Sequence, residues 1–192
     1  MDDSLIFLGF GVLCLVIGLF LKFYLDNPKN LEPAIPAQPL LPTQPQKPIE
    51  KKPKTDSIAE ILIFFGSQSG TAAKYSNILA EEAEKNNFDA KVIDLEEYES
   101  YKLQENICIF LMATFGEGDP TDNAKMFYKW LKGEPLSKDT LKGLRFSVFG
   151  LGNTQYQHYN SMGKNVNKLL EDMGGERFSF YLTNSWKLLK NY

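Results

Sequence analysis

Short apolar runs alternate with amphipathic segments from Ser57 to the end of the chain. A short apolar run bounded by glycine or polar residues is typical of a strand buried on both faces. Such runs predict strands at 61–65, 90–95, 107–113, 146–150 and 178–182, whereas helical spacing of apolar residues predicts helices at 72–86, 124–131 and 162–173. Strands that alternate with helices indicate an α/β fold, a doubly wound, parallel, five-stranded sheet with helices on both faces.

The N-terminal part of the chain is apolar over a longer stretch. Residues 5–21 read LIFLGFGVLCLVIGLFL, and the apolar character continues to Leu25. Because a helix needs about 20 apolar residues to cross a bilayer, residues 5–25 are predicted to form a single transmembrane helix. A cleaved signal peptide is the alternative. Asp2 and Asp3 in place of a basic region, and no small-residue cleavage site after Leu25, favour a retained signal-anchor helix.

Charges on the two sides of this apolar stretch predict its orientation. Acidic residues precede it, and basic residues lie at its end and beyond it: Lys22, Lys29, Lys47, Lys51, Lys52 and Lys54. By the positive-inside rule, we expect the bulk of the chain in the cytosol and residues 1–4 on the opposite side of the membrane.

Residues 27–56 form a linker in which proline recurs every third residue from Pro33 to Pro48. Three residues make one turn of polyproline II, so these prolines share one face of an extended helix. Such a segment predicts a semi-rigid spacer. A docking site for a proline-recognition domain is the alternative, but a spacer needs only this composition and is the favoured interpretation. Residues 57–192 are expected to form one globular domain.

Charge and cysteine content reduce the number of function classes that fit the chain. The formal net charge is −3 at pH 7, which argues against a nucleic-acid partner. Cys14 lies in the apolar stretch and Cys108 in a predicted strand, so they form neither a disulfide framework nor a metal cluster. We therefore expect no metal site, and a domain that faces a reducing compartment.

The first loop, residues 66–72, reads GSQSGTA and follows the first predicted strand. Its glycines allow a tight turn, and the helix that follows presents unpaired N–H groups to an anion. The sequence lacks the Gly-Lys-Ser/Thr of a nucleotide-hydrolysing loop, so neutral donors would bind the phosphate. A helix N-cap is the simpler interpretation. Three hydroxyls beside two glycines favour anion binding.

The second loop, residues 113–123, reads ATFGEGDPTDN and follows the third predicted strand. Phe115 stands between small residues and can stack on a flat ring. The carboxylates of Glu117, Asp119 and Asp122 lie beside it and raise the alternatives of metal binding or acid–base chemistry. No histidine accompanies them in sequence, and Asp122-Asn123 is also consistent with a simple cap of the next helix.

The third loop, residues 150–160, reads GLGNTQYQHYN and follows the fourth predicted strand. Tyr156 offers a second aromatic side chain for the other face of the same ring. His158 is the one histidine of the chain. No nucleophile or metal-ligand pattern surrounds it, so a structural hydrogen-bonding role is favoured over that of a general base.

Together, the three loops resemble the FMN-binding domain of the NADPH–cytochrome P-450 reductase family, with GSQSGTA, ATFGEGDPTDNA and FGLGNTQYQHYN in the family's order after matching strands. The resemblance runs from about Ile61 to Arg177, and the N-terminal apolar stretch also fits this family. It implies a flavodoxin-like fold and FMN as the cofactor. The implied FMN-binding residues are Ser67, Gln68, Ser69, Gly70, Thr71 and Ala72 for the phosphate, Thr114, Phe115, Gly116 and Gly118 for one side of the isoalloxazine, and Gly152, Asn153, Tyr156, His158 and Asn160 for the other side.

The resemblance also implies a route for electrons. In the complete family enzyme, hydride passes from NADPH to FAD, and electrons then pass singly through FMN to microsomal cytochromes P-450 and other membrane haem proteins. No side chain of this domain is expected to act as acid, base or nucleophile. The implied location is the endoplasmic reticulum membrane, with residues 1–4 lumenal and the flavin domain cytosolic. Surface acids such as Glu96 and Glu97 would steer a basic haem-protein face.

Three departures from the family pattern stand out. The regular proline spacing of the linker is not typical of the family. Phe115 stands where tyrosine is commonest in the family, which keeps stacking and removes a hydroxyl. After Arg177 the resemblance ends, where family members continue into an acidic loop beside the flavin and then into FAD and NADPH modules. We therefore expect a domain whose C-terminal part is incomplete, and an isolated chain that does not oxidise NADPH.

The leading hypothesis is an FMN-binding electron-transfer module of a membrane-anchored NADPH–haemoprotein reductase. The first alternative is a stand-alone, membrane-tethered flavodoxin-like carrier that a separate enzyme reduces. The second is a non-functional truncated product that folds poorly, because an uncovered sheet face favours aggregation.

Overall fold

The computed structural model of the chain describes residues 57–133, 137–178 and 182–183. The predicted transmembrane helix at 5–25 and the predicted linker at 27–56 lie outside the described residues. Within the part that the structure describes, no helix combines the length and the apolar character needed to cross a bilayer.

The sheet has the strand order β2-β1-β3-β5-β6. Its strands are β1 (Glu60–Gly66), β2 (Asp89–Asp94), β3 (Ile107–Phe115), β5 (Arg145–Leu151) and β6 (Glu176–Arg177). All neighbours along this path are parallel. Counted along the chain, the order is 2-1-3-4-5, which is one of the two common doubly wound arrangements. The predicted doubly wound parallel sheet is confirmed.

Among the described residues the sheet contains seven strands, two more than the sequence pattern predicts. β3 runs past the predicted end of its apolar run to Phe115, where β4 (Asp119–Pro120) pairs with it antiparallel. The fifth position is taken by two short strands, because β6 and β7 (Leu182–Thr183) both pair with β5. Two-residue strands carry no periodic signal, so the pattern could not reveal β4 or β6. Of the predicted strand at 178–182, residues 179–181 lie outside the described residues.

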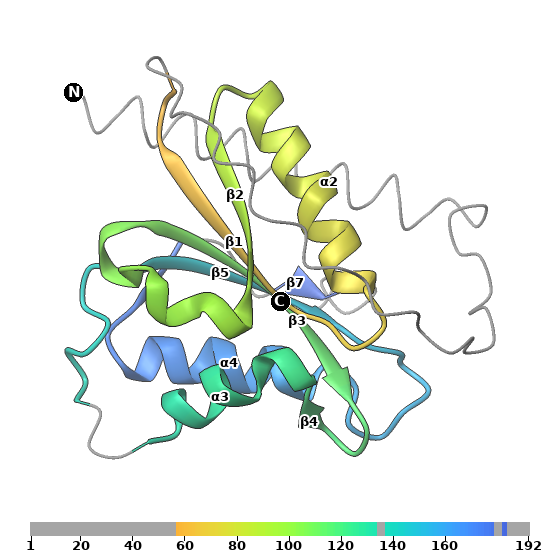
Figure 1. Cartoon of the computed structure of the whole chain (residues 1–192). Helices are drawn as coiled ribbons and strands as arrows, with labels where there is room; N and C mark the ends of the chain where they lie inside the picture. The colour runs from red at the N-terminus through yellow and green to blue at the C-terminus, as the bar shows by residue number, and fades with distance from the viewer. Residues whose placement is uncertain (1–56, 134–136, 179–181, 184–192) are drawn as a thin grey trace, which may run out of the picture. The chain divides into compact units, whose positions relative to one another are not determined.

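Helices cover both faces of the sheet. α2 (Thr71–Lys85) lies on one face, and α3 (Lys125–Leu131) and α4 (Ser161–Asp172) lie on the other (Figure 1). α4 buries Met162, Val166 and Leu170, which recur every four residues and therefore share one side of the helix. Short 3₁₀ helices, η2 (Leu95–Ser100), η3 (Leu103–Glu105) and η4 (Asp122–Ala124), occupy the connections.

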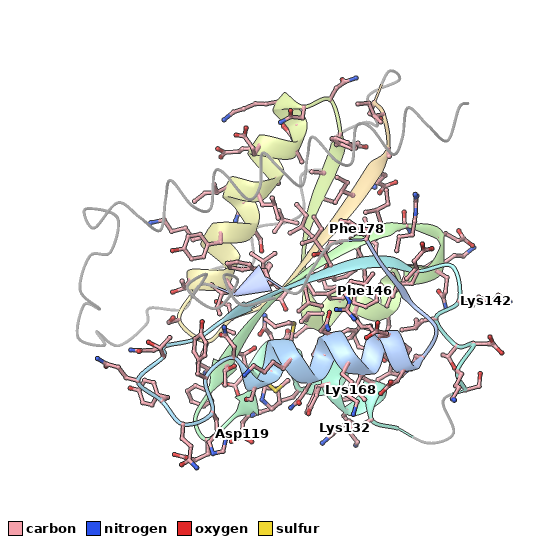
Figure 2. The ribbon with its side chains drawn as sticks, turned by 180° about the vertical axis from the view of Figure 1, so that it is seen from behind. Asp119, Lys132, Lys142, Phe146, Lys168 and Phe178 are labelled. Atoms are coloured by element: carbon pink, nitrogen blue, oxygen red, sulfur yellow. The ribbon has the colours of Figure 1, made fainter. Side chains whose placement is uncertain are left out.

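Aromatic rings form the centre of the core between the sheet and α3. The ring of Phe110 stacks on Phe64 and on Phe127, with centroid distances of 5.2 and 5.5 Å. Phe127 also contacts Tyr98 of η2 at 5.2 Å, so one α3 side chain joins the sheet to the 3₁₀ segment. Figure 2 shows Phe146 between the sheet and α4, where it is fully buried. This core fixes one end of α3 directly after the second loop.

Cys108 lies inside this core, and its thiol is expected to be unreactive in the folded protein. Burial raises the pKa of its thiol to about 12, so the reactive thiolate is scarce at neutral pH. In a Cys14→Ser variant, a disulfide reagent such as DTNB should leave the native protein unlabelled at pH 8 and react fully once guanidinium unfolds it. Rapid labelling of the native variant would contradict the burial of this side chain.

Candidate functional site

The three loops meet at one edge of the sheet because β1, β3 and β5 are parallel and each loop follows the carboxyl end of its strand. Asp119, at the turn of the second loop, marks this edge in Figure 2. Hydrogen bonds between residues that are far apart in sequence also join the second loop to the first loop and to the start of α4, directly after the third loop. The edge is therefore one assembled site and not three separate turns.

The first loop is shaped to receive an anion. Gly70 has a φ of +81°, a left-handed conformation that turns the chain into α2. Ser67 Oγ accepts a hydrogen bond from the N–H of Ala72 at 3.1 Å, so the loop closes on itself across residues 68–71. The backbone N–H groups of 68–71 make no hydrogen bond with another described residue. A row of open N–H groups at a helix start is suited to bind a phosphate.

Hydroxyl groups complete the first loop. Ser69 Oγ and Thr71 Oγ1 lie 3.2 Å apart on the exposed side of the loop. They add neutral donors at the same place as the open N–H groups. The cap interpretation also holds in part, because Ser67 satisfies an N–H of the first turn of α2. Capping by Ser67 and anion binding by 68–71 are compatible, since they use different atoms.

Gln68 connects the first loop to the second. Its Nε2 donates to Asp122 Oδ2 at 2.8 Å, and its Oε1 accepts from the N–H of Asp122 at 3.1 Å. Both ends of the side-chain amide are therefore bonded to Asp122. Its backbone N–H is the group of this residue that remains open to a ligand, in keeping with the predicted phosphate role.

Asp122 is held in its charged form. The hydrogen bond from Gln68, and then Lys125 at 2.6 Å, lower the pKa of the Asp122 carboxyl from its usual value. Because this pKa is lowered, the bonds of the Asp122 carboxylate to Gln68 and Lys125 stabilise the fold at any pH above the ordinary aspartate pKa. This stabilisation is lost as the pH falls through the lowered pKa. At neutral pH the connection between the two loops is fully formed.

The second loop is a tight hairpin between β3 and β4. Gly116 and Gly118 have φ values of +53° and +105°, and the N–H of Gly118 donates to Phe115 O at 3.2 Å. Phe115 is 47% exposed at the end of β3, although it is a large apolar side chain. An aromatic ring exposed beside a glycine turn is available to stack on a planar ligand, as the sequence predicts.

The third loop presents its aromatic residue on a folded turn. Asn153 forms the turn, because its Oδ1 accepts from the N–H of Gln155 at 2.9 Å and its carbonyl accepts from Tyr156 at 3.1 Å. Tyr156 is 68% exposed. Phe115 and Tyr156 thus come from different loops at the same sheet edge, and both are exposed there.

Two hydrogen bonds join the start of α4, directly after the third loop, to the second loop. Ser161 Oγ donates to Gly118 O at 3.2 Å, and the N–H of Met162 donates to Thr114 Oγ1 at 3.3 Å. His158 Nε2 lies 3.8 Å from Glu117 Oε2, and both side chains are exposed. The second loop is therefore fixed to the start of α4, which follows the third loop directly.

Gly152 lies where no side chain fits. A Cβ at this position would stand 2.7 Å from Asn160 Oδ1 and 3.0 Å from its backbone N. Asn160 is buried and has a φ of +54°, the left-handed conformation that asparagine tolerates better than most residues. This close approach of Gly152 and Asn160 sets the exit of the chain from the third loop into α4.

The predicted site residues thus lie on three loops at one edge of the sheet. Their contacts with a ligand stay a prediction. The sequence interpretation of Asp122-Asn123 as a cap is wrong. Neither η4 nor α3 has a side-chain cap, and Asn123 bonds to the first loop and to the ends of β1 and β2 instead. Sequence offers no signal for this role, because an asparagine before a helix has the same pattern in both cases.

The fold and the loops define a flavodoxin. The model of the Flavodoxin family matches residues 63–189 of the chain, well over half of its length, and the chain belongs to this family. The match continues past Arg177, where the resemblance of the sequence to its relatives was expected to end. FMN is accordingly the cofactor of the domain.

The chain is similar to several NADPH–cytochrome P-450 reductases. The reductase of Dictyostelium discoideum is 43% identical over 135 residues, which are 69% of this chain and 20% of the relative. The Homo sapiens protein is 43% identical over 135 residues, with 67% and 19% covered. The Oryctolagus cuniculus protein is 37% identical over 173 residues, with 85% and 25% covered. The chain spans about a fifth to a quarter of the length of these relatives.

A solved structure shares the fold. Oxidised Flavodoxin 1 from Bacillus cereus superimposes with a TM-score of 0.53 at 22% sequence identity, covering 65% of this chain and 83% of that chain. At this identity the likeness concerns the arrangement of the sheet and helices.

Proposed function

We propose that this domain is the FMN-binding electron-transfer module of a membrane-anchored NADPH–haemoprotein reductase. The observation that carries the proposal is the meeting of three loops at one sheet edge. The first loop has open N–H groups, and each of the other two has an exposed aromatic ring. A phosphate at one end and a planar ring at the other are the two ends of FMN. The similarity to the reductases named above supports the assignment to this class.

The first loop would hold the phosphate without a charged side chain. The N–H groups of residues 68–71 and the hydroxyls of Ser69 and Thr71 lie together, and α2 begins directly behind them. Its N-terminal dipole adds positive potential.

The second and third loops would hold the ring and tune it. Phe115 and Tyr156 would cover the ring and exclude water from it. Bound FMN supplies the capacity to accept two electrons and release them one at a time. The carboxylates of Glu117 and Asp119 lie beside Phe115 and oppose the arrival of negative charge, so they lower the tendency of the ring to be reduced.

The partner of this module would be a haem protein with a basic face, namely a microsomal cytochrome P-450 or another membrane haem protein. Glu96 and Glu97 are exposed on η2, directly after β2. Carboxylates of this kind raise the rate of encounter with a positive surface. The apolar stretch at 5–25 would anchor the chain in the endoplasmic reticulum membrane, with residues 1–4 lumenal and the domain in the cytosol beside its partner.

A single-turnover experiment tests the proposal. The FMN-loaded chain is reduced without oxygen, freed of reductant, and mixed with ferric cytochrome P-450 under carbon monoxide. We expect the ferrous–carbonyl band to form, at a rate that falls as salt screens the charges. The chain prepared without FMN serves as the control. A loaded, reduced chain that leaves the haem ferric would refute the proposed role.

A further inference from the structure

Asn123 holds the first loop in place from outside it, although it lies in the second loop. We propose that Asn123 is a positioning residue that sets the affinity of the site for the phosphate of the cofactor. The inference rests on the proposed function, because it assigns the first loop to the FMN phosphate. It concerns a residue that is expected to touch no part of the cofactor itself.

The side-chain amide of Asn123 makes four hydrogen bonds. Its Oδ1 accepts from the N–H of Ser67 at 3.0 Å and from Thr121 Oγ1 at 2.8 Å. Its Nδ2 donates to Phe65 O and to Asp94 Oδ1, both at 3.1 Å. These are two acceptor and two donor interactions, which is the full capacity of a carboxamide group. All four are at least partly shielded from water.

The four partners lie on three different segments. Phe65 and Ser67 flank the end of β1, Asp94 ends β2, and Thr121 belongs to the second loop. Asp94 Oδ1 also accepts from the N–H of Glu96 and so caps η2. One side chain therefore joins the ends of two strands to the second loop, at the edge where the cofactor binds.

Ser67 transmits this attachment to the phosphate site. Its backbone N–H is bonded to Asn123, and its Oγ accepts from the N–H of Ala72. The segment 68–71, with its open N–H groups, therefore lies between Ser67 and Ala72. Ser67 fixes both ends of this segment, because it bonds to Asn123 at one end and to Ala72 at the other. Donors fixed in advance bind an anion more tightly than donors that must be ordered on binding. Loss of the Asn123 contact would free one end of this segment.

The Gln68–Asp122 contact is a second and weaker attachment. It joins the same two loops, but its side chains are exposed, and water can replace each bond. Asn123 is partly buried, and removing its side chain would leave the N–H of Ser67 and the carbonyl of Phe65 without their present partner. We therefore assign the larger effect to Asn123.

The test compares FMN with riboflavin, which has the same ring and no phosphate. In the full chain, Asn123→Ala should weaken FMN binding by about tenfold to a hundredfold, the range for lost shielded hydrogen bonds. Riboflavin affinity should change much less. The readout is the dissociation constant of riboflavin divided by that of FMN, both measured by quenching of flavin fluorescence. Weaker binding of FMN alone lowers this ratio. A merely destabilised fold would weaken both ligands alike and leave this ratio unchanged.

Two further variants sharpen the result. Asn123→Asp keeps the acceptor, loses both donors and places a carboxylate beside Asp94, so it should also reduce the ratio. Adding Asp94→Asn restores an N–H between these two side chains and should recover part of the FMN affinity. Asn106→Ala is the matched control. Its Nδ2 donates to Lys102 O at the opposite end of β3, far along the strand from the loops, and its loss should leave the ratio unchanged.

The outcomes separate this inference from the proposed function. Wild-type chain that binds FMN, with an Asn123→Ala variant of unchanged ratio, would overturn the positioning role and leave the FMN module intact. Wild-type chain that binds neither ligand would overturn the FMN module itself. A lowered ratio in Asn123→Ala and in Asn123→Asp, with recovery in the double variant, would establish the inference.

Discussion

Replacing Phe127 by alanine should cost about 3–5 kcal/mol of folding free energy, the range for a large aromatic side chain removed from a core. Phe127 is fully buried and contacts the rings of Phe110, Tyr98 and Trp130. Its loss leaves a cavity between the sheet, η2 and α3, which neighbouring rings can fill only in part. Since domains of this size are stable by about 5–15 kcal/mol, the variant should be near the limit of folding.

Urea unfolding followed by circular dichroism measures this effect. Met126→Ala is a close control, because Met126 is the adjacent residue on α3 and is 62% exposed. Its substitution should change the free energy of unfolding by less than about 0.5 kcal/mol. If the two variants unfold at the same urea concentration, the stacked aromatic core is not what holds α3 against the sheet.

Tyr156→Ala should weaken FMN binding by roughly fivefold to more than a hundredfold, since aromatic stacking on a flat ring contributes about 1–3 kcal/mol. Tyr156 is 68% exposed and contributes little to the core, so the effect should fall on the cofactor and not on folding. The quantities to compare are the dissociation constant, from fluorescence quenching, and the free energy of unfolding of the protein without cofactor.

Tyr156→Phe keeps the ring and is the matched control. It should bind FMN within about threefold of the wild type, because stacking does not need the hydroxyl. Phe115→Ala should weaken FMN binding about as much as Tyr156→Ala does, and the double variant should bind FMN more weakly than either single variant. Full affinity in Tyr156→Ala would show that this ring does not cover the cofactor, and the site would then need another aromatic partner on the third loop.

Local pattern was sufficient for most of the regular structure. The runs at 61–65, 90–95, 107–113 and 146–150 coincide with β1, β2, β3 and β5 to within a residue or two at each end. The helices at 72–86 and 162–173 are shifted by one residue from α2 and α4. These elements are long enough for apolar periodicity to be visible. The pattern misses β4 and β6, because strands of two residues are too short to show a periodicity.

The three loops were also recognisable, since each carries its chemistry in consecutive residues. Glycines, hydroxyls and an aromatic residue after a strand have the same meaning wherever the strand lies. What consecutive residues could not show is which side chains the loops use to hold one another. Gln68 and Thr114 are predicted as ligand contacts, but Gln68 also bonds to the second loop and Thr114 also bonds to the start of α4.

The sequence by itself determined the α/β class, the order of the strands and helices along the chain, and the three loops that follow buried strands. The tertiary structure decided that Asn123 braces the first loop, that Gln68 bonds to Asp122, and that Gly152 must lack a side chain. The bonds of Asn123 to Ser67 and Phe65, and that of Gln68 to Asp122, join residues more than fifty positions apart in sequence. Contacts of this kind depend on strand order and register, and these are settled only when the apolar faces of the whole sheet are buried together.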